Sequence, residues 1–144
     1  GQDFVPYIST CDKIHAETNV AYGIFPNFIT PTDTSGYVVI LFWPKNIRET
    51  EIQYIQVGPK WEGNVKPQYW VDQEVSFNSI MEEDFQNLEP MQKSHDSGAF
   101  KKMPLNYQER RIYYYHQMVD DWVGRENISD DLITEDILTP FVEN

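Results

Sequence analysis

Runs of alternating or continuous apolar residues predict three β-strands in the first half of the chain. The first run covers residues 19–30, and Pro26 interrupts it, which indicates an edge strand or a bulge. Residues 31–36 have the composition of a turn, and the unbroken apolar run 37–43 is typical of a strand buried on both faces. Residues 51–57 then alternate polar and apolar. The short connections predict an antiparallel meander.

Two helical patterns follow the strands. The first extends from about residue 69 to 92, where Pro90 is expected to kink the end of the helix. The second begins near Asn106, which has capping-box spacing to Glu109, and Gly124 is its expected C-cap. The second helix carries an apolar stripe: Ile112, Tyr115, Val119, Trp122 and Val123. The pattern therefore predicts an α+β protein.

The length of 144 residues suits one domain, so residues 1–144 are expected to form a single domain that ends in an acidic tail, 125–144. A short apolar patch lies in this tail at residues 138–142. A three-stranded sheet leaves two edges that must be paired, covered or charged. Such edges favour self-association into a homo-oligomer.

Composition excludes several classes of partner and cofactor. The net charge of −12 repels phosphate backbones and anionic membrane surfaces, so nucleic acid and membranes are not expected partners. Because Cys11 is the only cysteine, the chain cannot hold a four-Cys cluster or a two-Cys, two-His Rieske [2Fe-2S] cluster. No signal peptide is evident, and the longest apolar run, 38–43, is too short for a membrane span. A cytoplasmic location is expected.

One acid of the first helix stands out on a helical wheel of about 100° per residue. Asp84 lies at the centre of an apolar face, whereas the nearby acids Glu82, Glu83 and Glu89 point away from it. The apolar face consists of Phe77, Ile80, Met81 and Leu88. A buried carboxylate needs a hydrogen-bond donor, partial exposure or a metal ion. The pattern by itself favours a structural role, and a metal ligand is the alternative.

The spacing of the three histidines does not predict a metal site together with Asp84. A mononuclear iron site of the two-His, one-carboxylate type needs two imidazoles held together opposite an acid. His15, His95 and His116 are far apart in the sequence and none has a histidine partner at helical spacing. His116 lies on the apolar stripe of the second helix, where a core role is expected. The sequence thus offers the carboxylate without the histidine pair.

The order of short motifs resembles a known family. The motifs are Ile-Phe-Pro-Asn at 24–27, a strand ending in Phe42-Trp43-Pro44, a long helix with Glu83-Asp84 and later Gln92, and a closing helix with Tyr115-His116. Over most of residues 19–123 this order resembles the C-terminal half of the catalytic domain of Rieske non-haem iron oxygenase α subunits, the ring-hydroxylating oxygenases.

The resemblance implies a partial helix-grip fold (Bet v 1-like or START-like), in which an antiparallel sheet curves around a long helix. In the family two histidines and one aspartate hold Fe(II), and the aspartate of the Glu-Asp motif corresponds to Asp84. The histidine pair and the Rieske [2Fe-2S] domain precede the matched segment and are absent from this chain. The chain is therefore expected to carry no catalytic residue of its own beyond this metal ligand and to be inactive alone.

For the intact enzyme, the resemblance implies a dioxygenase or monooxygenase that uses O₂. The reaction would be hydroxylation, dihydroxylation or demethylation of a small organic substrate, aromatic by expectation, with electrons from a reductase or ferredoxin. The substrate pocket would be lined by inward side chains of the strands and the helix, each of which could equally be core: Phe25, Tyr54, Phe77, Ile80 and Met81.

Two other functions stay open. The chain could be a stand-alone helix-grip domain that binds an apolar small ligand without metal, with Asp84 hydrogen-bonded to the ligand or to the backbone. The low strand count argues against this alternative. It could also be a non-catalytic docking subunit, which the free sheet edges and the acidic tail allow.

Overall fold

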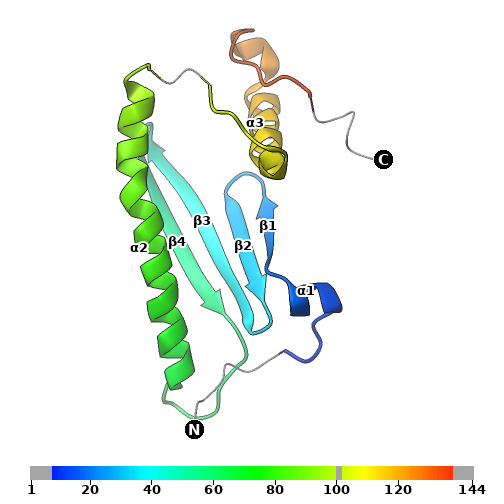
Figure 1. The fold of residues 1–144 in the computed structure, drawn as a ribbon, viewed down its shortest axis with the longest axis vertical. Helices are drawn as coiled ribbons and strands as arrows, with labels where there is room; N and C mark the ends of the chain where they lie inside the picture. Colours follow the sequence, from blue (N-terminus) through cyan, green and yellow to red (C-terminus); the bar gives the residue numbers. More distant parts are fainter. Residues whose placement is uncertain (1–7, 100–101, 138–144) are drawn as a thin grey trace. The chain divides into compact units, whose positions relative to one another are not determined.

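A computed structural model describes residues 8–99 and 102–137 (Figure 1). The chain splits into two compact units, Gly1–Ser97 and Gly98–Asn144. No helix among the described residues is long and apolar enough to cross a membrane. The predicted apolar patch at 138–142 lies outside the described residues.

The first unit is built on one antiparallel sheet with the strand order β1-β2-β3-β4. The strands are β1 (Val20–Ile24), β2 (Phe28–Asp33), β3 (Gly36–Asn46) and β4 (Glu49–Val57). A short helix, α1 (Lys13–Glu17), precedes them, and the long helix α2 (Gln68–Asp96) follows. The predicted α+β class and the antiparallel meander are confirmed.

The prediction of a single first strand over residues 19–30 is wrong, because this stretch forms the hairpin of β1 and β2. Pro26 has no amide hydrogen to donate to a ladder, and it lies in the connecting turn after a cis Phe25–Pro26 bond. The Asn27 side-chain amide donates to the carbonyl of Phe42 on β3 at 3.0 Å. The turn is thereby fastened to the neighbouring strand.

The predicted turn at 31–36 is also shorter than expected, since β2 continues to Asp33 and pairs with Gly36 at the start of β3. The Asp33 carboxylate closes this turn by accepting from the Ser35 amide at 2.6 Å and from the Gly36 amide at 3.0 Å. Gly36 has a φ of 155°, and a Cβ there would come within 2.1 Å of the Val57 carbonyl oxygen. Only glycine fits between the two strands at this point.

Helix α2 runs along the sheet beside β4 (Figure 1). The Tyr54 hydroxyl of β4 donates to Asn78 Oδ1 at 2.6 Å, and its ring meets Phe77 edge-on with 5.2 Å between centroids. At the other end of the helix, Arg48 pairs with Asp96. The hydrogen bond from the Arg48 guanidinium lowers the pKa of the Asp96 carboxyl below its ordinary value.

The predicted end of this helix near residue 92 is wrong, because α2 passes through Pro90 and ends at Asp96. A proline removes one backbone hydrogen bond of the helix, and the flanking turns remain bonded. The Ser97 amide closes the last turn by donating to the carbonyl of Lys93 at 3.1 Å.

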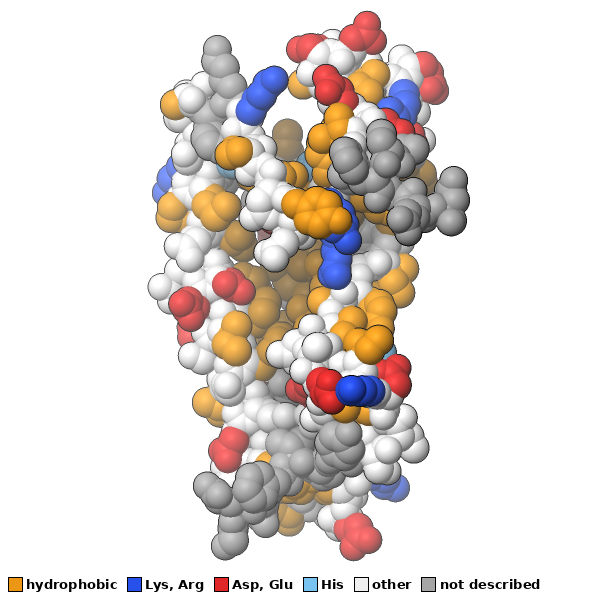
Figure 2. Space-filling model, turned by 45° about the vertical axis from the view of Figure 1, so that its right-hand side comes forward, with side chains coloured by type: hydrophobic (Ala, Val, Ile, Leu, Met, Phe, Trp, Pro, Cys, Tyr) orange, Lys and Arg blue, Asp and Glu red, His pale blue; other side chains and the backbone are white. Residues whose placement is uncertain are grey.

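The core of the first unit is small. Among the described residues, the buried apolar side chains are Ile40, in the middle of β3, and Trp70, in the first turn of α2. The Trp70 indole lies over Gly58, where a Cβ would come within 2.0 Å of Cη2. Many hydrophobic side chains remain at the surface instead (Figure 2).

The second unit contains α3 (Arg110–Val123), flanked by the short 3-10 helices η1 (Tyr107–Glu109) and η2 (Arg125–Asn127). The predicted capping box is confirmed: Asn106 accepts from the Gln108 amide, and Glu109 accepts from the Asn106 amide, both at 2.8 Å. Gly124 is the C-cap, as predicted, with a φ of 88°.

The expectation that the apolar stripe of α3 and His116 belong to a core is wrong for the described residues. Ile112 is 43% exposed and Trp122 is 71% exposed, and His116 is exposed too. The buried side chains of α3 are polar, namely Gln117 and Asp120. They are buried because the following segment, residues 129–136, folds back over the polar face.

This segment, which we call the strap, is held by side chains of α3. The Thr134 amide donates to Asp120 Oδ2 at 2.7 Å, and Gln117 Nε2 donates to the carbonyl of Glu135 at 3.3 Å. The Tyr113 hydroxyl also donates to the Glu135 carbonyl. Burial, followed by the charge of Glu135, raises the pKa of the Tyr113 phenol.

We expect the strap to detach at acidic pH. The hydrogen bond from the Thr134 amide lowers the pKa of Asp120 below its ordinary value of 3.8. A depressed pKa means that the carboxylate stabilises the folded form above the ordinary value and loses this effect as the pH falls through the lowered pKa. Protection of the Thr134 amide from hydrogen exchange, measured relative to its intrinsic rate at each pH, should therefore be present at neutral pH and be lost as the pH falls through the lowered pKa of Asp120.

A matched pair of variants tests this assignment. Asp120→Ala should release the Thr134 amide at every pH, whereas Asp130→Ala, which changes an exposed acid of the same strap, should leave its exchange unchanged. Equal exchange in the two variants would show that Asp120 does not hold the strap.

Candidate functional site

Asp84 continues, toward the C-terminal end of α2, the helical stripe whose N-terminal part packs on the sheet. It follows Phe77 by two helical turns, about 10 Å along the helix axis, and Trp70 precedes Phe77 by the same spacing. Trp70 is buried over Gly58, and Phe77 packs against Tyr54. The wheel thus identified a real face of the helix, and Asp84 belongs to it.

The expectation that Asp84 is buried among apolar side chains is nevertheless wrong for this chain. Asp84 is exposed, and so is every residue of α2 from Glu82 to Asp96. Leu88 on the same stripe is 52% exposed. The physical reason is that the side chains which pack α2 on the sheet come from its N-terminal half, so a carboxylate at position 84 stays in contact with solvent.

The described residues do not make a complete metal site. They contain no group of three or more His, Cys, Asp or Glu side chains placed to hold one ion. His95 is on the same helix as Asp84 but about 16 Å further along its axis. His15 is bonded to Asp12 at 2.8 Å and to the Tyr22 hydroxyl at 2.7 Å. Asp84 is therefore a single ligand candidate, and an iron ion does not fit these residues alone.

A cavity of about 360 Å³ lies between the sheet and the N-terminal half of α2. Of the five predicted pocket residues, Phe77 and Ile80 line it, whereas Phe25, Tyr54 and Met81 do not. Phe25 is in the turn after β1, Tyr54 packs beside Phe77, and Met81 is half-buried on α2. The structure therefore brings part of the predicted set together.

Sequence reasoning missed one part of this cavity. Its walls there include Ser35, Trp70 and Gln73. Trp70 could have been found by extending the stripe of Asp84 and Phe77 back by two turns, because it has the same helical phase. Ser35 comes from the turn between β2 and β3, which no helical or strand period marks.

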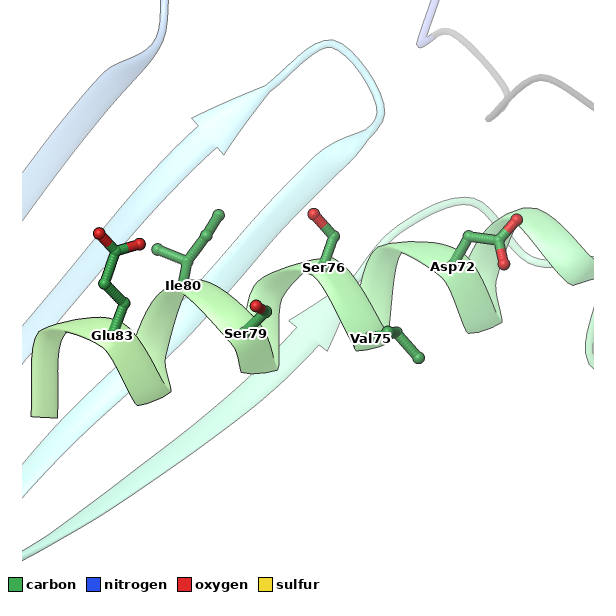
Figure 3. Close-up of a pocket in the computed structure, with 6 residues that line it drawn as sticks. All are labelled: Asp72, Val75, Ser76, Ser79, Ile80 and Glu83. Atoms are coloured by element: carbon green, nitrogen blue, oxygen red, sulfur yellow. The ribbon is translucent and has the colours of Figure 1, made fainter. Parts of the chain in front are cut away.

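A second hollow lies on the surface of α2, and all of its lining residues belong to that one helix (Figure 3). They are Asp72, Val75, Ser76, Ser79, Ile80 and Glu83. Ser76, Ile80 and Glu83 project from the same side of the helix, and Val75 points away from them (Figure 3). A hollow with walls on one helix cannot enclose a ligand, so the cavity against the sheet is the better binding site.

Comparison with known families gives the class of this protein. The family model of the ring hydroxylating alpha subunit (catalytic domain) matches residues 4–125. No curated protein and no solved structure matches the chain. The chain belongs to the ring-hydroxylating α-subunit catalytic-domain family, which is a family of iron-dependent oxygenases and hence of oxidoreductases. The four-stranded antiparallel sheet with its long helix agrees with the helix-grip-like fold predicted for it.

Proposed function

We propose that this chain is the C-terminal part of the catalytic domain of a Rieske-type oxygenase α subunit, in which Asp84 supplies the carboxylate ligand of Fe(II). The family match over residues 4–125 supports the assignment to the catalytic domain. The observation that carries the role of Asp84 is its place on α2, on the same stripe as Trp70 and Phe77. A solvent-exposed carboxylate in helical phase with residues that line the cavity supports a role as a metal ligand.

The chain by itself is proposed to be inactive. One carboxylate cannot retain a ferrous ion against water, since sites of this type use two imidazoles as well. The single cysteine also prevents the chain from holding a Rieske cluster that would supply electrons. The remaining ligands and the electron supply would come from a longer chain, from a ferredoxin or reductase, and from further subunits. The substrate would be a small organic molecule, aromatic by class.

A metal-free ligand-binding domain is the second candidate. The exposure of Asp84 and the presence of a cavity against the sheet favour it, because neither feature requires a metal. In that case Asp84 would be an ordinary surface acid. The two candidates differ in what precedes this segment in the gene and in what Asp84 binds.

The first experiment is to read the coding DNA on the 5′ side of this segment. We expect an open frame that encodes a Cys-x-His…Cys-x-x-His pair followed by two closely spaced histidines. A start codon directly before the segment, without such an extension, would contradict the oxygenase assignment and favour the metal-free domain.

A second experiment tests the proposed inactivity of the 144-residue chain. The chain should form no product from a small aromatic substrate when it is supplied with reductase, ferredoxin, Fe(II) and O₂. Turnover would contradict its proposed inactivity.

A further inference from the structure

Three side chains are joined by hydrogen bonds at the β1 edge of the sheet, the edge opposite β4. The Tyr22 hydroxyl of β1 lies 2.7 Å from His15 Nε2, and His15 Nδ1 lies 2.8 Å from Asp12 Oδ1. His15 belongs to α1, which precedes β1 at this edge (Figure 1). None of the three side chains lines the cavity between the sheet and α2.

The direction of these hydrogen bonds follows from the charge of Asp12. Asp12 Oδ1 also accepts the backbone amide of His15 at 3.0 Å, and this bond lowers the pKa of the Asp12 carboxyl. At neutral pH the group is therefore a carboxylate, which can only accept. His15 Nδ1 must then carry a hydrogen, so Nε2 of the neutral ring is an acceptor and the Tyr22 hydroxyl donates to it.

Tyr22 is thus a phenol whose proton already points at a base. Loss of one electron makes the hydroxyl group of a phenol a strong acid, so oxidation is easier where a base takes the proton in the same step. The distance of 2.7 Å is within the reach of direct proton transfer. The imidazolium that forms lies against the Asp12 carboxylate, and the opposite charges stabilise the product.

Two other tyrosines of the described residues donate to groups that are not bases. The Tyr54 hydroxyl donates to the side-chain amide oxygen of Asn78, and the Tyr113 hydroxyl donates to the backbone carbonyl of Glu135. Neither acceptor takes up a proton at neutral pH. Burial, followed by the charge of Glu135, also raises the pKa of Tyr113, which opposes loss of its proton. Tyr22, by contrast, is 45% exposed, so a small oxidant in solution reaches its ring.

We propose that Tyr22 is a redox-active tyrosine, which gives one electron to a small radical oxidant such as the carbonate radical and its phenolic proton to His15 Nε2. The O–H bond of Tyr22 breaks and an N–H bond forms on His15. The products are a neutral phenoxyl radical, an imidazolium held by Asp12, and carbonate. This step is independent of the role of Asp84 and is measured without metal.

Nitration of the 144-residue chain tests the proposal. Peroxynitrite with carbon dioxide supplies the carbonate radical and nitrogen dioxide. The phenoxyl radical and nitrogen dioxide form a C–N bond at the carbon beside the hydroxyl, and the hydrogen of that carbon restores the phenol, which leaves a nitrotyrosine. Tyr37 is the internal reference, because it is also 45% exposed and lies on the same sheet. The tryptic peptide 14–45 carries both tyrosines, and its fragment ions assign the nitro group.

The ratio of nitration at Tyr22 to nitration at Tyr37 is the quantity to measure. We expect Tyr22 to be nitrated at least about tenfold more than Tyr37, because a positioned base typically accelerates a proton transfer about a hundredfold or more. The ratio should be smaller in D₂O than in H₂O, since the proton moves in the step at Tyr22. A role of His15 in folding alone would not produce this isotope effect.

Three variants assign the effect to the hydrogen-bonded side chains. His15→Gln keeps a hydrogen-bond acceptor that cannot take a proton, so nitration at Tyr22 should fall to the level of Tyr37. Asp12→Asn keeps a side chain that caps α1 and removes the charge, so the ratio should fall part of the way. Glu17→Gln neutralises an exposed acid of the same helix and should leave the ratio unchanged.

Circular dichroism shows whether each variant is folded. If His15→Gln does not fold, the ratio in the unaltered chain and its decrease in D₂O still decide the proposal. Equal nitration of Tyr22 and Tyr37 in the unaltered chain would overturn it. A ratio that is the same in His15→Gln, or the same in the two solvents, would overturn the role of His15 as proton acceptor and with it the proposal.

Discussion

Under the proposed function, Asp84→Asn should abolish iron binding by the complete catalytic domain, the proposed longer chain that would supply the histidine pair. An asparagine side chain has nearly the same shape, but it is neutral and is a much weaker ligand for Fe(II) than a carboxylate. Loss of a direct ligand should exceed the effect of removing an outer-shell partner, so the dissociation constant for iron should rise more than about a hundredfold. Turnover should fall in parallel with the iron content.

The matched control is Glu82→Gln, which neutralises an exposed acid on the same helix, two residues away and off the stripe of Asp84. Iron content by colorimetric assay and urea denaturation should be measured for both variants. Because Asp84 is exposed, neither change should alter stability by more than about 0.5 kcal/mol. Full iron content in Asp84→Asn, or equal loss in Glu82→Gln, would remove Asp84 from the metal site.

Trp70→Ala should unfold the first unit. Trp70 and Ile40 are the buried apolar side chains among the described residues, so the ring is a large share of a small core. Replacing a buried tryptophan by alanine costs about 3–5 kcal/mol. A domain is typically stable by about 5–15 kcal/mol, and a unit with so few buried residues belongs at the lower end. We expect the urea midpoint to fall sharply or the sheet signal to disappear.

Trp122→Ala is the control for this second prediction, because Trp122 is 71% exposed on α3. Its removal should change the free energy of unfolding by no more than about 0.5 kcal/mol. A large effect of Trp122→Ala would mean that Trp122 is covered in solution, whereas a small effect of Trp70→Ala would mean that burial of Trp70 is not what stabilises the first unit.

The cavity and Asp84, the proposed metal ligand, share the helix α2. Trp70 and Asp84 are separated by four helical turns, about 21 Å along the axis. Phe77 and Ile80 fall between them. Under the proposed function, changes at Phe77 or Ile80, which line the cavity, should alter which atom of the substrate is oxidised without changing the iron content.

Local patterns predicted the elements whose stability is decided within a few residues. The capping box of Asn106 and Glu109 and the stop at Gly124 depend on hydrogen bonds and backbone angles of neighbouring residues, and both are present as predicted. The meander followed from short connections between β-branched runs. The stripe that joins Phe77 to Asp84 needed only the helical period.

Other features depended on contacts between residues distant in the sequence. The hairpin at Pro26 is fastened by Asn27 to Phe42, and the position of Trp70 requires a glycine at 58. One part of the cavity wall needs Ser35 beside Gln73. No local period encodes these pairs. The exposure of Asp84 likewise could not be inferred from the wheel, which gives the direction of a side chain and not what lies opposite.

By itself, the sequence determined the α+β class, the helix that carries Asp84 and the family resemblance that the match over residues 4–125 confirms. These depend on local periodicity, turn chemistry and the order of motifs. Only the tertiary structure decided which face of α3 is buried, where the cavity lies and that the buried indole N–H of Trp70 has no acceptor among the described residues. Burial and hydrogen-bond satisfaction are properties of what folds against a side chain, and that partner can come from anywhere in the chain.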